Sequence, residues 1–412
     1  MSLKDRLALL SKQRGLRAGE TASASEAAHP QTTAERLQRL LDRSARLKAS
    51  ARTKDGDVAE LLGGSVIADG VVVVERFYCP DYVHGAEPLA ALIDAPLHVL
   101  NDDQPVETSG LLFLDTETTG LAGGTGTLPF VLGLARAEPE GLRVRQYFLT
   151  GFKGEAEMLA HARTWLDEAT HLVTFNGKCF DVPLLATRYR LTRLATPLQA
   201  KGHLDLLHPT RAAFANRWPN CRLQTAEQRL LAFVRENDLG GHLVPMVWTA
   251  FLRLGRMDDV PRVLEHNRWD LVSLAGLLAR LSAIFAGGRH ADADALAIAR
   301  HRMRRGDEAG ALKQLADCAS SLGVDGLLEL ARLRRRRGDW EHAVAVWEHL
   351  AEQGVAEALE RLAKYHEHIR RDLAAALALT EQLAARQVGE AAHVRRRQRL
   401  LLKVDNLSIE FG

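Results

Sequence analysis

Two acidic residues stand two positions apart at the end of an apolar segment, where they could bind metal ions. Asp115 and Glu117 follow Leu111–Leu114, four apolar residues that are typical of a buried β-strand and too few for a helix. Side chains two apart on a strand point to the same face of the sheet. Two buried carboxylates repel each other unless cations neutralise them, and oxygen ligands favour Mg²⁺ or Mn²⁺ over zinc. The pair therefore predicts a site for those ions, although a solvated turn before Thr119-Gly120 would show the same residues.

Two further acidic residues stand in comparable settings later in the chain. Asp181 follows the strand pattern His171–Phe175 and precedes Val182-Pro183, which suits the N-cap of a helix as well as a metal ligand. Asp270 lies in a long apolar helix pattern, and His266, four residues earlier, shares a helix face with it. On an exposed helix these two would form an ordinary ion pair, but the surrounding leucines predict a buried face.

Basic residues are concentrated in the segment 176–222, although the whole chain has a net charge of only +2. Eight lysines and arginines stand there against two aspartates, with aromatic residues among them. Such a surface suits single-stranded nucleic acid, through phosphate contacts and base stacking. Arginine stems that pack on the protein itself would leave the same pattern. Within the segment we expect Asn176, Lys178 and Arg188 to contact a substrate, the first two because they follow a strand end.

The composition is that of an ordinary soluble protein with room for two or three domains. Of the 412 residues, 46% are hydrophobic and 26% are charged. The four cysteines are isolated from one another, which predicts reduced thiols in a cytoplasmic protein and argues against a disulfide framework or a zinc site. No apolar run is long enough to span a membrane, and the first residues lack the apolar core of a signal peptide.

The segments around the acidic residues predict a sheet with flanking helices. Periodicity predicts three strands and an amphipathic helix, at Leu111–Asp115, Phe130–Arg136, Arg143–Leu149 and Ala156–Ala169. Upstream, the strand patterns Ser65–Ala68 and Val71–Tyr78 flank Asp69-Gly70, which predicts a β-hairpin closed by a type I′ turn. The glycine-rich loop 121–129 lacks the lysine and hydroxyl residue of a phosphate-binding P-loop.

The chain after Gly287-Gly288 is rich in alanine, leucine and arginine and repeats itself. Three turns, each carrying an aspartate (Asp307, Asp339 and Asp372), recur at spacings of 32 and 33 residues. This is the period of paired helices in tetratricopeptide-like repeats. We expect an all-α region that binds a protein partner or supports the rest of the chain.

The acidic motifs resemble those of the DEDD superfamily of 3′–5′ exonucleases, which has a ribonuclease-H-like fold. Asp115–Gly120 is similar to the first motif of that family, Asn176–Leu185 to the second and His266–Leu274 to the third. The chain is especially similar to a YprB-like bacterial group, whose members carry a comparable Asn-Gly-Lys-x-Phe-Asp and a later Asp-Leu, here Asp205-Leu206. The resemblance covers about residues 108–285.

This resemblance implies an α/β fold, with a ribonuclease-H-like mixed sheet flanked by helices, beside the all-α helical repeats. We therefore divide the chain into a polar, partly helical or disordered segment, a hairpin extension, an exonuclease domain and a repeat region, at 1–60, 61–107, 108–286 and 289–403.

The resemblance also implies a site and a reaction. Asp115, Glu117, Asp181 and Asp270 would hold two Mg²⁺ or Mn²⁺ ions, and His266 would accept a proton from the attacking water. Family members with histidine in that role usually have it five residues before the last aspartate, and the four-residue spacing found here is usually that of tyrosine. The implied activity is metal-dependent 3′–5′ hydrolysis of single-stranded DNA or RNA. A binding scaffold that has lost catalysis and a structure-selective endonuclease are the alternatives.

Overall fold

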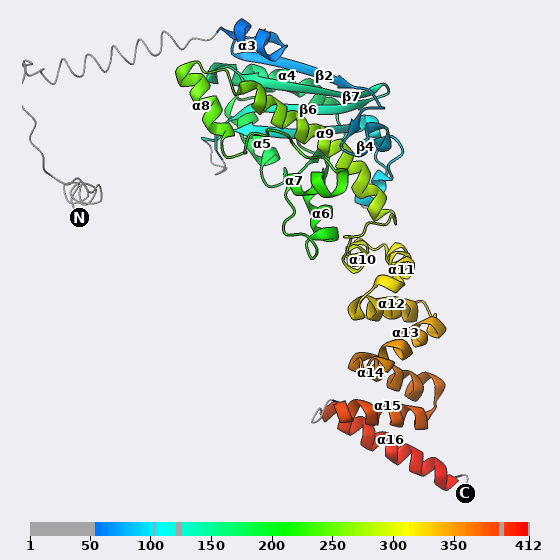
Figure 1. Ribbon diagram of the computed structural model, residues 1–412. Coiled ribbons are helices and arrows are strands. Elements are labelled where there is room, and N and C mark those ends of the chain that lie inside the picture. The colour runs from blue at the N-terminus through cyan, green and yellow to red at the C-terminus, as the bar shows by residue number, and fades with distance from the viewer. Residues whose placement is uncertain (1–53, 102–103, 121–125, 387–390, 411–412) are drawn as a thin grey trace, which may run out of the picture. The chain divides into compact units, whose positions relative to one another are not determined.

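The computed structural model describes residues 54–101, 104–120, 126–386 and 391–410 (Figure 1). The predicted N-terminal segment lies outside these residues as far as position 53, and so does the part of the glycine-rich loop at 121–125. The last residues of that N-terminal segment begin helix α3 (Asp55–Leu62).

A seven-stranded mixed sheet forms the centre of the fold and confirms the predicted fold class. Its strands are ordered β1-β2-β7-β6-β5-β8-β9. Strand β5 lies antiparallel to β6 and parallel to β8, so the acidic strand occupies the point where the sheet changes from antiparallel to parallel pairing. The seven strands are Ser65–Ala68 (β1), Val71–Tyr78 (β2), Leu111–Thr118 (β5), Pro129–Glu138 (β6), Gly141–Leu149 (β7), His171–Thr174 (β8) and Gly202–Asp205 (β9).

Helices cover both faces of the sheet because β5 buries apolar side chains on both. Leu112 and Leu114 join one apolar cluster, whereas Leu111 and Phe113 join the other. The first cluster lies under α3, α4 (Glu155–Glu168), α5 (Asp181–Leu191) and α8 (Val244–Leu254), and the second under α6 (Leu207–Phe214), α7 (Leu223–Ala226) and part of α9 (Val260–Phe285).

Helix α9 is the long helix that the leucine pattern predicts. It has a proline in its first turn, and the predicted leucines along it are buried. Its start packs into the first cluster through Val260 and Val263, and its buried apolar residues from Leu271 to Phe285 pack into the second. The helix therefore crosses strands β5, β6 and β7, and it carries its central residues past the acidic strand (Figure 1).

The predicted hairpin is present, but its turn differs from the prediction. Strands β1 and β2 pair antiparallel, with Ala68 opposite Val71. A type I′ turn needs a positive φ at both central residues, and here only Gly70 has one, at 86°. A register shift between Val66 and Ala68 supplies an extra residue beside the turn, which relaxes the demand on the turn itself.

The C-terminal region consists of helices that pack on their neighbours in sequence. The recurring aspartates lie at the starts of three of them: Asp307 accepts from the Gly310 amide at 2.7 Å, Asp339 from His342 at 3.4 Å and Asp372 from Ala375 at 2.9 Å. The region contains α10 (Ala295–Arg304), α11 (Glu308–Asp317), α12 (Val324–Arg336), α13 (Trp340–Glu352), α14 (Ala356–Tyr365), α15 (Leu373–Arg386) and α16 (Ala391–Glu410). Within the described residues, no helix has both the length and the apolarity of a membrane span.

Candidate active site

The central strand brings Asp115 and Glu117 to one face of the sheet. They continue the alternation of Leu111 and Phe113 along β5, and Glu117 is buried, with 9% of its surface exposed. Asp115 pairs in register with Gly133 on β6. Two carboxylates thus stand at the end of the strand that lies between the antiparallel and parallel parts of the sheet.

Asp181 approaches the same strand from α5. Asp181 is the first residue of that helix. The N-cap position, which the sequence also suggested for Asp181, is occupied by Phe180. The Thr116 hydroxyl, between the two acidic residues of β5, donates a hydrogen bond to Asp181 Oδ1 at 2.5 Å. The carboxylate of Asp181 is therefore tied to the acidic strand.

Helix α9 brings His266 and Asp270 to the same place. They lie on one helix face, as predicted, with 3.7 Å between His266 Nε2 and Asp270 Oδ2. His266 Nε2 also lies 3.8 Å from Glu117 Oε1. One ligand atom from each of these three residues lies within 4.8 Å of the others, which is close enough to hold one metal ion.

The electrostatics of the cluster show a deficit of positive charge. Burial raises the pKa of Asp115 well above its usual range, and the charges of Asp270 and Asp181 raise it further. Burial likewise raises the pKa of Glu117, as do Asp115 and Asp270. Burial raises the pKa of Asp181 to about 6, although the hydrogen bond from Thr116 acts to lower it. Oxygen-rich, buried and repelling carboxylates are the donor set that fits divalent Mg²⁺ or Mn²⁺.

An amide relay orients Asp115. Asn267 Nδ2 donates to Asp115 Oδ2 at 2.7 Å, and Asn267 Oδ1 accepts from Gln146 Nε2, also at 2.7 Å. The relay crosses β6 above Gly133, where an added Cβ would lie 2.2 Å from Asn267 Oδ1. Glycine at this position is therefore what lets α9 approach the sheet closely enough for Asn267 to reach Asp115.

A buried arginine holds Asp270. Arg235 contacts Asp270 Oδ1, and it donates two hydrogen bonds of 2.8 and 2.6 Å to Glu227. Its side chain is only 4% exposed. Burial and the neighbouring carboxylates act in opposite directions on Arg235, and the carboxylates prevail, so its pKa is raised. Ser273 in turn donates to Glu227 at 2.5 Å, which anchors the group to α9.

Asp238 holds the ring of His266. Its Oδ1 lies 2.6 Å from His266 Nδ1, in the segment between the π-helix Glu227–Leu231 and α8. Sequence reasoning missed Asp238, Arg235 and Glu227. They stand in or beside an irregular segment, so no helix or strand period relates them to the acidic residues.

The predicted substrate residues lie in and after the loop between β8 and α5. Asn176 has a φ of 70°. Its backbone amide donates to Asp205 Oδ1 at 2.7 Å, and the backbone amide of Lys178 donates to Asp205 Oδ2 at 3.0 Å. Asp205 on β9 thereby fixes the loop before Asp181. The Lys178 side chain is exposed. Arg188 lies further along α5, where its Nη2 donates to Glu155 Oε2 at 2.5 Å.

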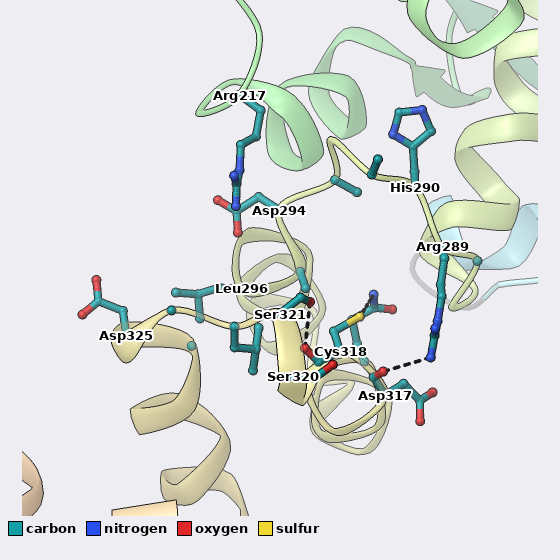
Figure 2. A pocket seen from close by; sticks show the side chains of 18 of the residues that line it. Arg217, Arg289, His290, Asp294, Leu296, Asp317, Cys318, Ser320, Ser321 and Asp325 are labelled. Atoms are coloured by element: carbon teal, nitrogen blue, oxygen red, sulfur yellow. Dashed lines mark hydrogen bonds between the residues drawn. The ribbon is translucent and has the colours of Figure 1, made fainter. Parts of the chain in front are cut away.

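A cavity of about 760 Å³ lies apart from this cluster (Figure 2). It is lined by residues around the start of the C-terminal helical region, among them Arg217, Arg289, Asp294 and Asp325. The Arg289 guanidinium donates to a backbone carbonyl there, that of Asp317, at 3.3 Å. None of the predicted site residues lines this cavity.

Comparison with known proteins shows a superfamily and a relative that this chain resembles. A family model described as the RNase H superfamily matches residues 112–282, a range that includes the four carboxylates and His266. The curated protein "Uncharacterized protein YprB" of Bacillus subtilis (strain 168) is 34% identical over 285 residues, which are 66% of this chain and 69% of that protein.

Proposed function

The chain belongs to the RNase H superfamily, and we propose that it is a metal-dependent nuclease that hydrolyses phosphodiester bonds. The superfamily indicates a nucleic-acid hydrolase that uses divalent metals. The observation that carries the proposal is the convergence of acidic side chains from β5, α5 and α9, among which burial raises the pKa values of Asp115, Glu117 and Asp181. Such a group is costly to bury without cations, and the cations it fits are those that catalyse phosphoryl transfer.

More specifically, we propose a 3′–5′ exonuclease with two metal ions. Asp115, Glu117 and Asp270 would hold one ion. Asp115 would also contribute to the second ion, which Asp181 would hold as well. When bound, such ions lower the pKa of an attacking water and offset the charge that builds on the phosphate. The chain itself orients the carboxylates, through the hydrogen bonds of Asn267, Thr116 and Arg235.

His266 completes the proposed site. The contact between Asp238 and Nδ1 leaves Nε2 as the ring nitrogen that faces the carboxylates. A nitrogen placed there serves either as the proton acceptor that the sequence predicts or as a ligand of the ion.

The substrate we propose is single-stranded DNA or RNA. Phe180, next to Asp181, has 53% of its surface exposed, which suits stacking on a base. Asn176 and Lys178 lie in the same loop, where Lys178 can contact phosphate, and Arg188 follows on α5. We also propose a cytoplasmic location, supported by four free cysteines, and a protein partner for the repeat helices.

The test is hydrolysis of end-labelled nucleic acid. The full chain with Mn²⁺ is incubated with 5′-labelled single- and double-stranded DNA and RNA, beside Asp115→Asn. Asp69→Asn serves as the matched control, because the Asp69 side chain is 76% exposed. We expect stepwise shortening from the 3′ end by the wild type and the control alone. Internal fragments would instead identify an endonuclease. Binding without Mn²⁺-dependent cleavage of any substrate, or equal cleavage by Asp115→Asn, would contradict the proposal.

A further inference from the structure

The hydrogen-bond partner of His266 fixes which ring nitrogen carries a proton. Asp238 Oδ1 lies 2.6 Å from Nδ1, and both side chains are 12% exposed. A carboxylate can only accept, so Nδ1 must donate its proton to Asp238. Arg235 Nη1 approaches the same nitrogen at 3.3 Å, but a protonated Nδ1 has no lone pair left to offer it. In the neutral ring the lone pair therefore lies on Nε2.

That lone pair faces two carboxyl groups. Nε2 lies 3.8 Å from Glu117 Oε1 and 3.7 Å from Asp270 Oδ2. Both separations are too long for hydrogen bonds. One ligand atom from each of His266, Glu117 and Asp270 lies within 4.8 Å of the others, so a single ion between them could contact all three.

The spacing of the three atoms suits a shared ion. Nitrogen and oxygen ligands lie about 2.1 Å from Mn²⁺- or Zn²⁺-sized ions, so two ligands of one ion are about 3–4.2 Å apart. The distances from Nε2 fall inside that range. Arg235 contacts Oδ1 of Asp270 and thereby leaves Oδ2 for the ion. A histidine held at one nitrogen by a carboxylate, with the other nitrogen turned to a metal, is a common second-shell arrangement.

We infer that His266 binds a metal ion through Nε2, together with Glu117 and Asp270. The inference rests on the proposed metal dependence of this site and changes the role of His266. A nitrogen that binds an ion has no lone pair with which to accept a proton, so His266 is a ligand in place of a general base. One imidazole among oxygen ligands also favours Mn²⁺ over Mg²⁺.

The deciding experiment is pulsed electron paramagnetic resonance on the full chain loaded with Mn²⁺. A directly bound nitrogen couples its nuclear spin to the manganese electrons, which a general base would not do. We expect ¹⁴N coupling in the wild type and in His161→Gln, whose histidine is exposed on α4, and none in His266→Gln. We also expect His266→Gln to weaken Mn²⁺ binding about 10–100-fold and Mg²⁺ binding less.

A second variant covers the case in which His266→Gln fails to fold. Asp238→Asn keeps the histidine but loses the charged partner, so ¹⁴N coupling should persist while Mn²⁺ affinity falls about tenfold. Bound Mn²⁺ without ¹⁴N coupling in the wild type would overturn the inference. Cleavage without this coupling would remove the ligand role alone, whereas coupling without cleavage would remove the nuclease proposal alone.

Discussion

Two buried acidic sites in this protein have opposite surroundings. Glu367, on the π-helix His366–Arg370 in the C-terminal helical region, has a side chain that is only 1% exposed. Burial alone would raise its pKa, but hydrogen bonds from Arg399 and Lys403 outweigh burial and lower it. Arg396 approaches it as well, at 3.7 Å. Around β5, by contrast, three carboxylates have raised pKa values and Arg235 is the buried cation in contact with the group.

The difference separates an anchor from a binding site. A buried carboxylate surrounded by arginine and lysine is already neutralised, and it ties α16 to the helices before it. Carboxylates buried together with too few cations carry an electrostatic cost that a divalent ion relieves. A buried acidic residue alone therefore does not indicate function, and the number of cations that already surround it distinguishes these two sites.

Asp115→Asn should produce the largest contrast between activity and stability. Removing a ligand of the proposed ions should lower the hydrolysis rate by at least about 100-fold. Removing one charge from a repelling group should leave the metal-free protein as stable as the wild type or more so. The measurements are the rate with Mn²⁺ and the melting temperature with a chelator. A variant that is both inactive and strongly destabilised without metal would break the comparison.

Gly133→Ala should disturb the acidic group without changing its charge. The new Cβ would force Asn267 away from Asp115, which should lower activity about tenfold and stability by about 1–3 kcal/mol. Gly151→Ala is the matched control, because a Cβ there meets no atom within 4 Å. Rates and denaturant unfolding would be measured for both variants. An active Gly133→Ala would show that the amide relay is dispensable.

Glu367→Gln should show the opposite balance to Asp115→Asn. It should leave the specific activity unchanged and lower the free energy of unfolding by about 1–2 kcal/mol. The loss is limited because Arg399 and Lys403 are 50% and 47% exposed, and water can solvate them. Glu381→Gln, whose side chain is 47% exposed beside Arg397, should have little effect on unfolding by urea. Equal effects of the two glutamine variants would remove the anchor role.

Changing the pH should move the two sites in opposite directions. In the metal-free protein the folded state binds more protons at Asp181 than the unfolded chain between pH 3.8 and about 6, so stability from this group falls as pH rises through that window. Glu367 has a lowered pKa, so its contribution is present above the usual 4.5 and is lost as pH falls further.

Metal binding near pH 6 should therefore release protons, with about half a proton coming from Asp181. Calorimetric titration with Mn²⁺ in buffers of different ionisation enthalpy measures that number. Asp181→Asn should reduce it, and Glu367→Gln should leave it unchanged. Binding without proton release would contradict the raised pKa values of the acidic group.

Arg371→Gly should give the smallest effect and concerns the backbone next to Glu367. Arg371 ends the π-helix with a φ of 56°, where Gly306 and Gly338 have 84° and 78° at the corresponding turns. Relieving this left-handed conformation should stabilise the repeat region by about 0.5–1 kcal/mol, measured by thermal unfolding. Arg370→Gly, inside the π-helix, should not stabilise it. A neutral or destabilising Arg371→Gly would show that the side chain matters more than the backbone.

The parts of the site that follow a regular period could be read from the sequence. Asp115 and Glu117 share a face because a strand repeats every two residues, and His266 and Asp270 share one because a helix repeats nearly every four. Six of the seven strands and the long buried helix followed in the same way from apolar periodicity, whereas β9 was not predicted. The structure brings these residues together, while their roles in binding and catalysis stay proposals.

The partners of these residues depend on tertiary contacts that no local period encodes. Arg235 and Asp238 reach α9 from an irregular segment, and nothing in their spacing relates them to His266 or Asp270. Asn267 stands beside His266 in the sequence, but its hydrogen bond to Asp115 depends on Gly133 on β6. A side chain at that position would collide with Asn267. The type I′ prediction for the turn after β1 was wrong for a related reason, because the register shift in β1 changed the backbone conformation that the turn needed.

The hydrogen bonds that hold Asp115, Asp181 and Asp270 come from the protein itself, so the acidic group is assembled before any ion arrives. Removing metal from the protein with a chelator should then leave the acidic residues in their ligand positions. Reloading would need only the loss of water from the incoming ion and would not wait for the chain to refold.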